Sequence, residues 1–165
     1  MNSWHLLFLA LASLWGCQPA ANKEISLGQP IRHDDFIYSA EQVVVYDSLG
    51  ALKPEGKFWI ITFRVDNEAK RVEHHWDNNT AFIVDYKGNV YENSLTAQQQ
   101  LDNLHPFGWK AHYTTLAGRI DSTQLVFDLP RSVKQPYLKV RGDLLMGDVF
   151  DGRQFEHTKV KLFSP

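Results

Sequence analysis

The sequence predicts an all-β protein: an immunoglobulin-like antiparallel β-sandwich with one short helix or structured loop, preceded by a lipoprotein signal peptide. Three observations support this. Apolar and polar residues alternate with a period of two through most of the chain, as in half-buried strands. Turn residues separate these segments at short intervals, which is typical of a sandwich. The apolar N-terminal segment ends at Cys17, the only cysteine among 165 residues.

The N-terminal segment has the features of a lipoprotein signal peptide. Its apolar run, residues 6–15, is about ten residues long, which suits a signal peptide, whereas a spanning helix needs about twenty. Small Gly16 precedes Cys17, as a lipoprotein signal peptidase requires. We therefore expect removal of residues 1–16, a diacylglyceryl lipid on Cys17 and a flexible tether over residues 17–27. An ordinary signal peptide cut near residues 20–21 and an uncleaved apolar anchor are the alternatives, and both also export the domain.

The residue after the cysteine bears on the destination. Gln18 stands where enterobacterial lipoproteins retained in the inner membrane carry aspartate, so we expect an outer-membrane lipoprotein of the bacterial cell envelope. The expected partners are the membrane, through the lipid on Cys17, and another envelope protein. The net charge is −2 and no basic run occurs in the sequence. Neither nucleic-acid binding nor electrostatic adhesion to anionic lipid is therefore expected.

Residues 28–165 are expected to form the sandwich. With a single cysteine the domain has no intrachain disulfide, so its stability must come from apolar packing and strand hydrogen bonds. The composition supports this, because 44% of the residues are hydrophobic and 13% are aromatic.

The clearest strand is residues 57–67. One face is apolar throughout, and the other begins apolar at Phe58 and Ile60 but becomes polar at Thr62 and Arg64. Such a strand belongs in a sheet that packs against a second sheet. A short helix or structured loop is expected at residues 95–104, and a tight turn at Asp151–Gly152 between segments 144–150 and 154–155. The other expected strands are 36–46, 81–86, 90–92, 109–115, 124–129, 135–141 and 159–163.

Three short motifs carry a family resemblance. They are a strand ending in Asn67, a hairpin of the form Asp85-x-x-Gly88-x-x-Tyr91, and the strand end Phe127-Asp128-Leu129-Pro130. In this order, over residues 28–163, the chain resembles the telokin-like, immunoglobulin-fold family of bacterial secreted lipoproteins, whose function is unknown. The resemblance implies protein interactions at the cell envelope and no catalytic residues. Chemically, asparagine suits a turn, glycine supplies a positive φ, and proline ends a strand.

Aromatic side chains in or beside expected loops form one candidate binding face. Tryptophan and tyrosine dominate the energetics of many interfaces, so exposed rings there would anchor a protein or carbohydrate partner. The alternative is that these rings cap the open ends of the sandwich core. The candidates are Trp76, Phe107, Trp109 and Tyr113.

Histidines and a carboxylate form a second candidate site, a metal site built from His74, His75, His33 and Asp34. Imidazole and carboxylate groups bind zinc or copper when three or four converge. Adjacent histidines in an extended chain point to opposite faces, however, so solvated loop histidines are the alternative.

No catalytic motif accompanies these residues. The sequence has no Gly-x-Ser-x-Gly elbow and no phosphate-binding glycine loop, and a lipidated Cys17 cannot act as a nucleophile. We therefore expect no enzyme and no cofactor. The predicted function is a membrane-tethered module that binds a protein or ligand. A periplasmic or surface metal-binding module is the alternative.

Overall fold

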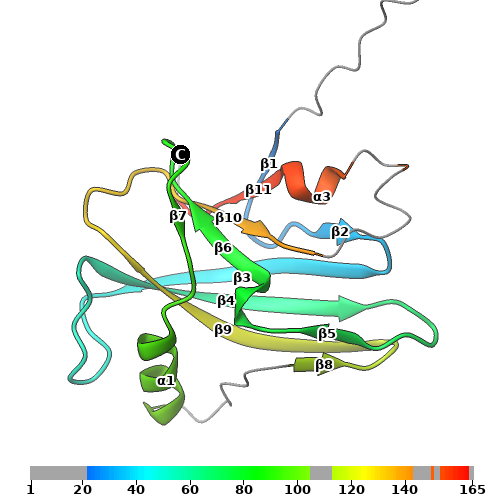
Figure 1. The fold of residues 1–165 in the computed structure, drawn as a ribbon, viewed down its shortest axis with the longest axis horizontal. Coiled ribbons are helices and arrows are strands. Elements are labelled where there is room, and N and C mark those ends of the chain that lie inside the picture. Colours follow the sequence, from blue (N-terminus) through cyan, green and yellow to red (C-terminus); the bar gives the residue numbers. More distant parts are fainter. Residues whose placement is uncertain (1–21, 105–112, 143–149, 151–152, 164–165) are drawn as a thin grey trace, which may run out of the picture.

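The protein is a β-sandwich of two facing sheets, seen in a computed structural model that describes residues 22–104, 113–142, 150 and 153–163 (Figure 1). Five strands form sheet A, in the order β1 (Lys23–Ile25), β11 (Thr158–Lys161), β10 (Tyr137–Val140), β6 (Ala81–Val84) and β7 (Val90–Tyr91). Four form sheet B, in the order β2 (Ile31–His33), β3 (Phe36–Tyr46), β4 (Lys57–Asn67) and β9 (Arg119–Leu129).

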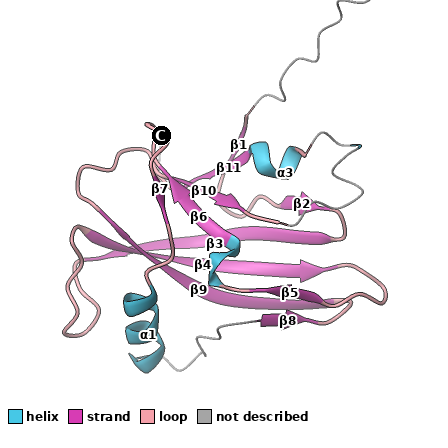
Figure 2. Ribbon diagram, in the orientation of Figure 1, coloured by secondary structure: helices cyan, strands magenta, loops and turns pink. Residues whose placement is uncertain are grey.

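Smaller elements complete the fold (Figure 2). Strands β5 (His74–Trp76) and β8 (Tyr113–Thr115) form an antiparallel pair beside sheet B. The helices of the described residues are α1 (Leu95–Leu104), the 3-10 helix η1 (Asn78–Thr80) and α3 (Gln154–His157). Among the described strands, all pairs are antiparallel except β1 with β11. The predicted all-β, immunoglobulin-like sandwich is confirmed. No helix in the described part of the chain is long and apolar enough to cross a membrane.

The two faces of β4 meet different partners. Its apolar face packs in the main core, where Ile61, Phe63 and Val65 are fully buried against Ile83 and Leu138 of sheet A. On the other face, Phe58 and Ile60 form a second apolar cluster with Leu49, Ala97, Leu101 and Val126. Helix α1 therefore covers the apolar half of this second face of β4. The polar half, which includes Thr62 and Arg64, lies beyond that cluster.

The domain begins earlier than predicted. Residues 23–25 were expected to belong to the flexible tether, but they form β1, which pairs in parallel with β11. The Glu24 carboxylate lies 3.0 Å from the ammonium groups of Lys159 and Lys161, and these ion pairs lower the pKa of Glu24. A three-residue segment with two charges has no recognisable strand pattern of its own, so its conformation depends on the partner strand.

Other boundaries also differ. Gln154 and Phe155, expected beyond a hairpin turn, start the short helix α3, because Phe155 packs into the main core from a helical turn. Strands β2 and β5 were not predicted. In the expected strand at 109–115, the described residues 113–115 form β8. Residues 109–112 and 144–149 and the Asp151–Gly152 turn lie outside the described residues.

The hairpin motif builds a turn through the Asp85 side chain. Its carboxylate accepts hydrogen bonds from the backbone N–H groups of Lys87 and Asn89, at 2.8 and 2.9 Å, and from the Asn89 side chain at 2.8 Å. The Tyr91 hydroxyl donates a longer one of 3.3 Å. Gly88 has a φ of 84°, which favours glycine. All the motif residues of this hairpin therefore have structural roles.

The Asp128 motif holds a second turn. Its carboxylate accepts hydrogen bonds from the backbone N–H groups of Glu55 (2.9 Å) and Gly56 (3.3 Å). A Cβ at Gly56 would lie only 2.1 Å from the carbonyl oxygen of Leu129, so only glycine fits there. This motif therefore anchors the turn before β4 to the end of β9.

The Asp85 turn should make the protein sensitive to acid. Burial raises the pKa of Asp85, but hydrogen bonds from Asn89, Lys87 and Tyr91 outweigh it and leave the pKa below its ordinary value of 3.8. A lowered folded-state pKa stabilises the protein above the unfolded-state pKa, and the stabilisation is lost as the pH falls through the folded-state pKa. We expect the unfolding free energy of wild type to fall more steeply below about pH 4 than that of Asp85→Asn. Urea unfolding from pH 2 to 7 tests this; parallel profiles would contradict it.

Candidate functional site

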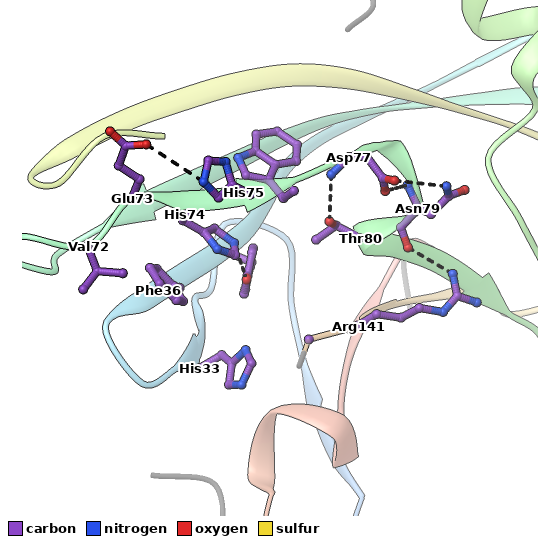
Figure 3. Close-up of a pocket in the computed structure, with 13 residues that line it drawn as sticks. His33, Phe36, Val72, Glu73, His74, His75, Asp77, Asn79, Thr80 and Arg141 are labelled. Atoms are coloured by element: carbon purple, nitrogen blue, oxygen red, sulfur yellow. Dashed lines mark hydrogen bonds and ion pairs between the residues drawn. The ribbon is translucent and has the colours of Figure 1, made fainter. Parts of the chain in front are cut away.

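A cleft of about 680 Å³ opens where β2, β3, β5 and the end of β10 meet (Figure 3). Chain segments far apart in the sequence contribute to it, because β5 crosses beside sheet B while β10 belongs to sheet A. Its lining combines aromatic rings with groups that form hydrogen bonds. The lining residues are His33, Phe36, Tyr38, Val72, Glu73, His74, His75, Trp76, Asp77, Asn79, Thr80, Arg141 and Gly142.

One wall of the cleft is built around His74. Its imidazole stacks on the ring of Phe36, with centroids 4.0 Å apart and planes 17° apart. Its Nε2 lies 2.7 Å from the hydroxyl of Tyr38, which is also on β3. Phe36 and Tyr38 point to the same side of the strand because they are two positions apart. The stacking and the hydrogen bond together hold the imidazole in one orientation.

The opposite side of the cleft contains His33, a buried residue with a relative exposure of 2%. Its ring stacks on Phe155 of α3, with centroids 3.8 Å apart. A Cβ at Gly142 would lie 2.3 Å from Cε1 of His33, so the chain after β10 can approach this ring only at a glycine. Gly142 therefore sets the shape of the cleft on this side.

The rim is held by polar contacts. Arg141 donates hydrogen bonds to both carboxylate oxygens of Glu92, at 2.8 and 2.7 Å, and to the carbonyl oxygen of Asn79 at 3.0 Å. The hydrogen bond from Arg141 lowers the pKa of Glu92, and burial opposes it only in part. Asp77 caps η1 by accepting a 2.7 Å hydrogen bond from the N–H of Asn79. The rim is thus largely preorganised for a ligand.

The cleft is suited to binding. Stacked rings offer flat apolar contact area, and the side chains of Glu73, His75 and Asn79 offer exchangeable hydrogen bonds near solvent.

Two of the predicted binding-face aromatics are core residues. Trp76 and Tyr113 are 5% and 6% exposed, and their rings stack with centroids 4.1 Å apart. Trp76 also donates a 2.9 Å hydrogen bond to the hydroxyl of Thr115. For this pair the exposed binding face is wrong and the alternative holds, because the β5–β8 pairing turns both rings inward to close one end of the core. Phe107, Trp109 and Cys17 lie outside the described residues.

Three of the predicted metal residues, His33, His74 and His75, line the cleft, but their rings do not converge on one point. His74 faces β3, whereas His75 faces outward, where its Nδ1 lies 3.1 Å from the hydroxyl of Thr114 (Figure 3). Asp34 is exposed in a turn with a φ of 55° and does not line the cleft. Among the described residues, no three His, Cys, Asp or Glu side chains lie close enough together to hold a metal ion. The histidines are also not solvated loop residues throughout, since His33 is buried in β2.

Several lining residues were missed by the sequence analysis. Phe36 and Tyr38 were recognised only as strand residues, Arg141 only as the end of another strand, and Gly142 was not assigned to any element. The alternation of β3 shows that Phe36 and Tyr38 share a face, but no local pattern shows that β5 and β10 approach that face.

Comparisons with known proteins support the fold. No protein-family model matches the chain, and a search of curated protein sequences finds no match. Among solved structures, the yjhA protein from Bacillus subtilis is similar, with a TM-score of 0.56 and 12% identity over 86% of this chain and 99% of its own. A conserved hypothetical protein from Bacillus anthracis has a TM-score of 0.54 and 15% identity over 70% of this chain and 88% of its own. The secreted protein MPT63 from Mycobacterium tuberculosis has a TM-score of 0.53 and 11% identity over 76% and 93%. At these identities the likeness shows the fold alone.

Proposed function

We propose that the protein is an exported lipoprotein of the telokin-like, immunoglobulin-fold type, tethered to the outer membrane by a lipid on Cys17. Its sandwich binds another envelope protein in the cleft and catalyses no reaction. The observation that carries the binding role is the cleft itself, in which the stacked imidazole of His74 and the buried His33 face a shared space. Residues of the family-like motifs do not line this space, because they form turns elsewhere.

Export is supported by two independent features. The N-terminal apolar segment ends in the single cysteine, as a lipoprotein signal peptide does. One of the proteins that share the fold, MPT63, is itself a secreted protein. A sandwich with no disulfide is compatible with export because its core is apolar and continuous between the two sheets.

The tether is tested by radiolabelled palmitate and detergent phase partitioning. Wild type should incorporate the label and enter the detergent phase, and Cys17→Ser should lose the label. An unlabelled, aqueous wild-type protein would rule out the lipoprotein and leave a freely diffusing exported module.

The cleft is tested by site-specific photo-crosslinking in intact cells. A photoreactive amino acid at Val72, which lines the cleft and is 59% exposed, should give one discrete adduct. The same group at Ile120, which is 52% exposed on sheet B outside the cleft, is the matched control and should not give it. His74→Ala in the Val72-labelled protein should abolish the adduct, because it removes the stacked imidazole wall. An adduct that survives His74→Ala would place the partner elsewhere.

A further inference from the structure

The outer face of sheet A collects cationic side chains that are dispersed in the sequence. Register pairs Tyr137 with Lys161 and Val84, and Lys139 with Phe82, so these side chains lie on one face. The alternate residues Ile83, Leu138, Val140 and Val160 point into the main core. We call the outward set the cationic face. It consists of Lys139, Lys159, Lys161 and Arg141, the rings of Phe82, Tyr137 and Phe163, and the carboxylates of Glu24 and Glu92.

The charge of this face is opposite to that of the whole chain. Its four cationic side chains exceed its two carboxylates, a balance of +2, whereas the chain as a whole carries −2. Both carboxylates lie at the margins, Glu24 on the edge strand β1 and Glu92 just after the opposite edge strand β7. Glu24 pairs with Lys159 and Lys161, and Glu92 pairs with Arg141, so the excess positive charge lies along β10 and β11, between the two carboxylates. The net charge of −2 predicts no adhesion to anionic lipid, but it does not reveal this patch, because strand alternation places a lysine only at every second residue.

The cations lie over aromatic rings. The ammonium group of Lys159 is 4.2 Å from the ring centroid of Tyr137, and the guanidinium carbon of Arg141 is 4.1 Å from that of Phe82. The ring of Phe163 packs edge-on against Tyr137 at 5.3 Å. Apolar stems and rings beneath outward charges form an amphipathic surface, and such surfaces are favourable at a membrane interface.

The tether brings this face close to the membrane. Cys17 and Lys23 are six residues apart, so the chain between them spans at most about 20 Å even when fully extended. A domain of this size is about 40 Å across. A lipid on Cys17 therefore keeps β1 at or near the bilayer surface. Strand β1 is an edge of sheet A, as Figure 1 shows, so the cationic face adjoins the anchored edge.

We propose that the cationic face docks on the anionic lipid headgroups of the membrane that holds the anchor. The closeness of β1 to the membrane depends on the proposed lipidation of Cys17, whereas the charge of the cationic face and the register of its strands do not. Docking by this face holds sheet A against the bilayer and leaves the outer face of sheet B directed away from it.

Vesicle binding by the full-length Cys17→Ser chain tests the docking without a lipid anchor. Vesicles of phosphatidylcholine with 30% phosphatidylglycerol are compared with pure phosphatidylcholine by sedimentation, so that any binding by the apolar N-terminal residues cancels in the ratio of affinities. Each lysine near an anionic surface contributes about fivefold to affinity. Lys139→Gln with Lys161→Gln should therefore lower the ratio about 25-fold, and 0.5 M salt should abolish the preference for anionic vesicles.

The matched control removes two exposed lysines from loops beside sheet B, Lys53→Gln with Lys70→Gln, which changes the net charge equally. It should leave the ratio unchanged. Thermal unfolding of both double variants shows that each is folded. Equal affinity for the two vesicle types, or equal loss in both double variants, overturns the docking proposal. Palmitate labelling of wild type is scored separately, so a missing label overturns the lipoprotein proposal alone.

Discussion

Replacing Asn67 by alanine should destabilise the protein by about 3–4 kcal/mol. The side chain is fully buried at the end of β4. Its Nδ2 donates hydrogen bonds to the carbonyl oxygens of Val72 (2.8 Å) and Thr115 (2.9 Å), and its Oδ1 accepts one from the N–H of Ala69 (3.0 Å). Alanine would leave the buried Thr115 carbonyl and Ala69 N–H and the partly buried Val72 carbonyl without these partners. Each such loss costs about 1–3 kcal/mol, with some recovery through local rearrangement. Urea unfolding with an unchanged m-value measures the effect.

An aspartate at this position separates hydrogen bonding from packing. The carboxyl group introduced by Asn67→Asp would keep the acceptor but, when ionised, would face two carbonyl oxygens, so its folded-state pKa should be raised. The penalty should therefore be small at pH values below the unfolded-state pKa of about 3.9 and should grow as the pH rises above it. Asn103→Ala on the exposed surface of α1 is the control and should change stability by less than about 0.5 kcal/mol. A similar loss in Asn103→Ala, or a penalty for Asn67→Asp that does not change with pH, would contradict this account.

The Asn67 contacts show why the family-like motifs are structural. Asn67 joins the end of β4 to the segment before β5 and to β8, Asp85 closes the β6–β7 hairpin, and Asp128 holds the turn before β4. In each motif, one side chain forms hydrogen bonds with backbone groups at a strand end. The resemblance therefore concerns the scaffold, and the cleft residues are contributed by other positions.

Most long elements were predictable because their pattern is carried by many residues; of the eleven-residue β9, only residues 124–129 were predicted. Strands β3 and β4, at eleven residues each, and α1, at ten, have the predicted bounds. Strands β1, β2 and β5 have three residues each, too few for alternation to be recognised, and tertiary pairing decides their conformation.

The cleft was predictable only in part. His33 and His74 were both selected as candidate site residues, and they do line one cleft. The metal interpretation needed a third ligand, and the opposite orientations of His74 and His75 follow from strand geometry. For Trp76 and Tyr113 the sequence could not decide between an exposed face and a cap on the core, because burial of an aromatic ring depends on a strand partner 37 residues away. The cationic face was missed for the same reason, since it forms only after β10 and β11 pair.

Replacing Gln98 by leucine should destabilise the protein by about 2–4 kcal/mol and promote aggregation. Strand β9 is an edge of sheet B, and edges expose backbone groups that recruit other chains. Gln98, 3% exposed on α1, covers this edge. Its Nε2 donates to the carbonyl oxygen of Gln124 (2.6 Å), and its Oε1 accepts from the N–H of Val126 (2.9 Å). The side-chain amide thus takes the place of a neighbouring strand, assisted by Asn93, whose Nδ2 donates to the carbonyl oxygen of Val126 (3.0 Å).

Leucine has a similar size but cannot form these bonds, so the Val126 N–H and the Gln124 carbonyl would lose their partners. Gln99→Leu is the matched control, because it adds the same side chain at the exposed neighbouring position of α1. If added hydrophobicity alone caused aggregation, the exposed Gln99→Leu would aggregate at least as much. If the uncovered edge causes it, Gln98→Leu alone should lose stability and show concentration-dependent light scattering below its unfolding midpoint. Equal behaviour of the two variants would mean that α1 stabilises sheet B only through Ala97 and Leu101, which pack in the second apolar cluster.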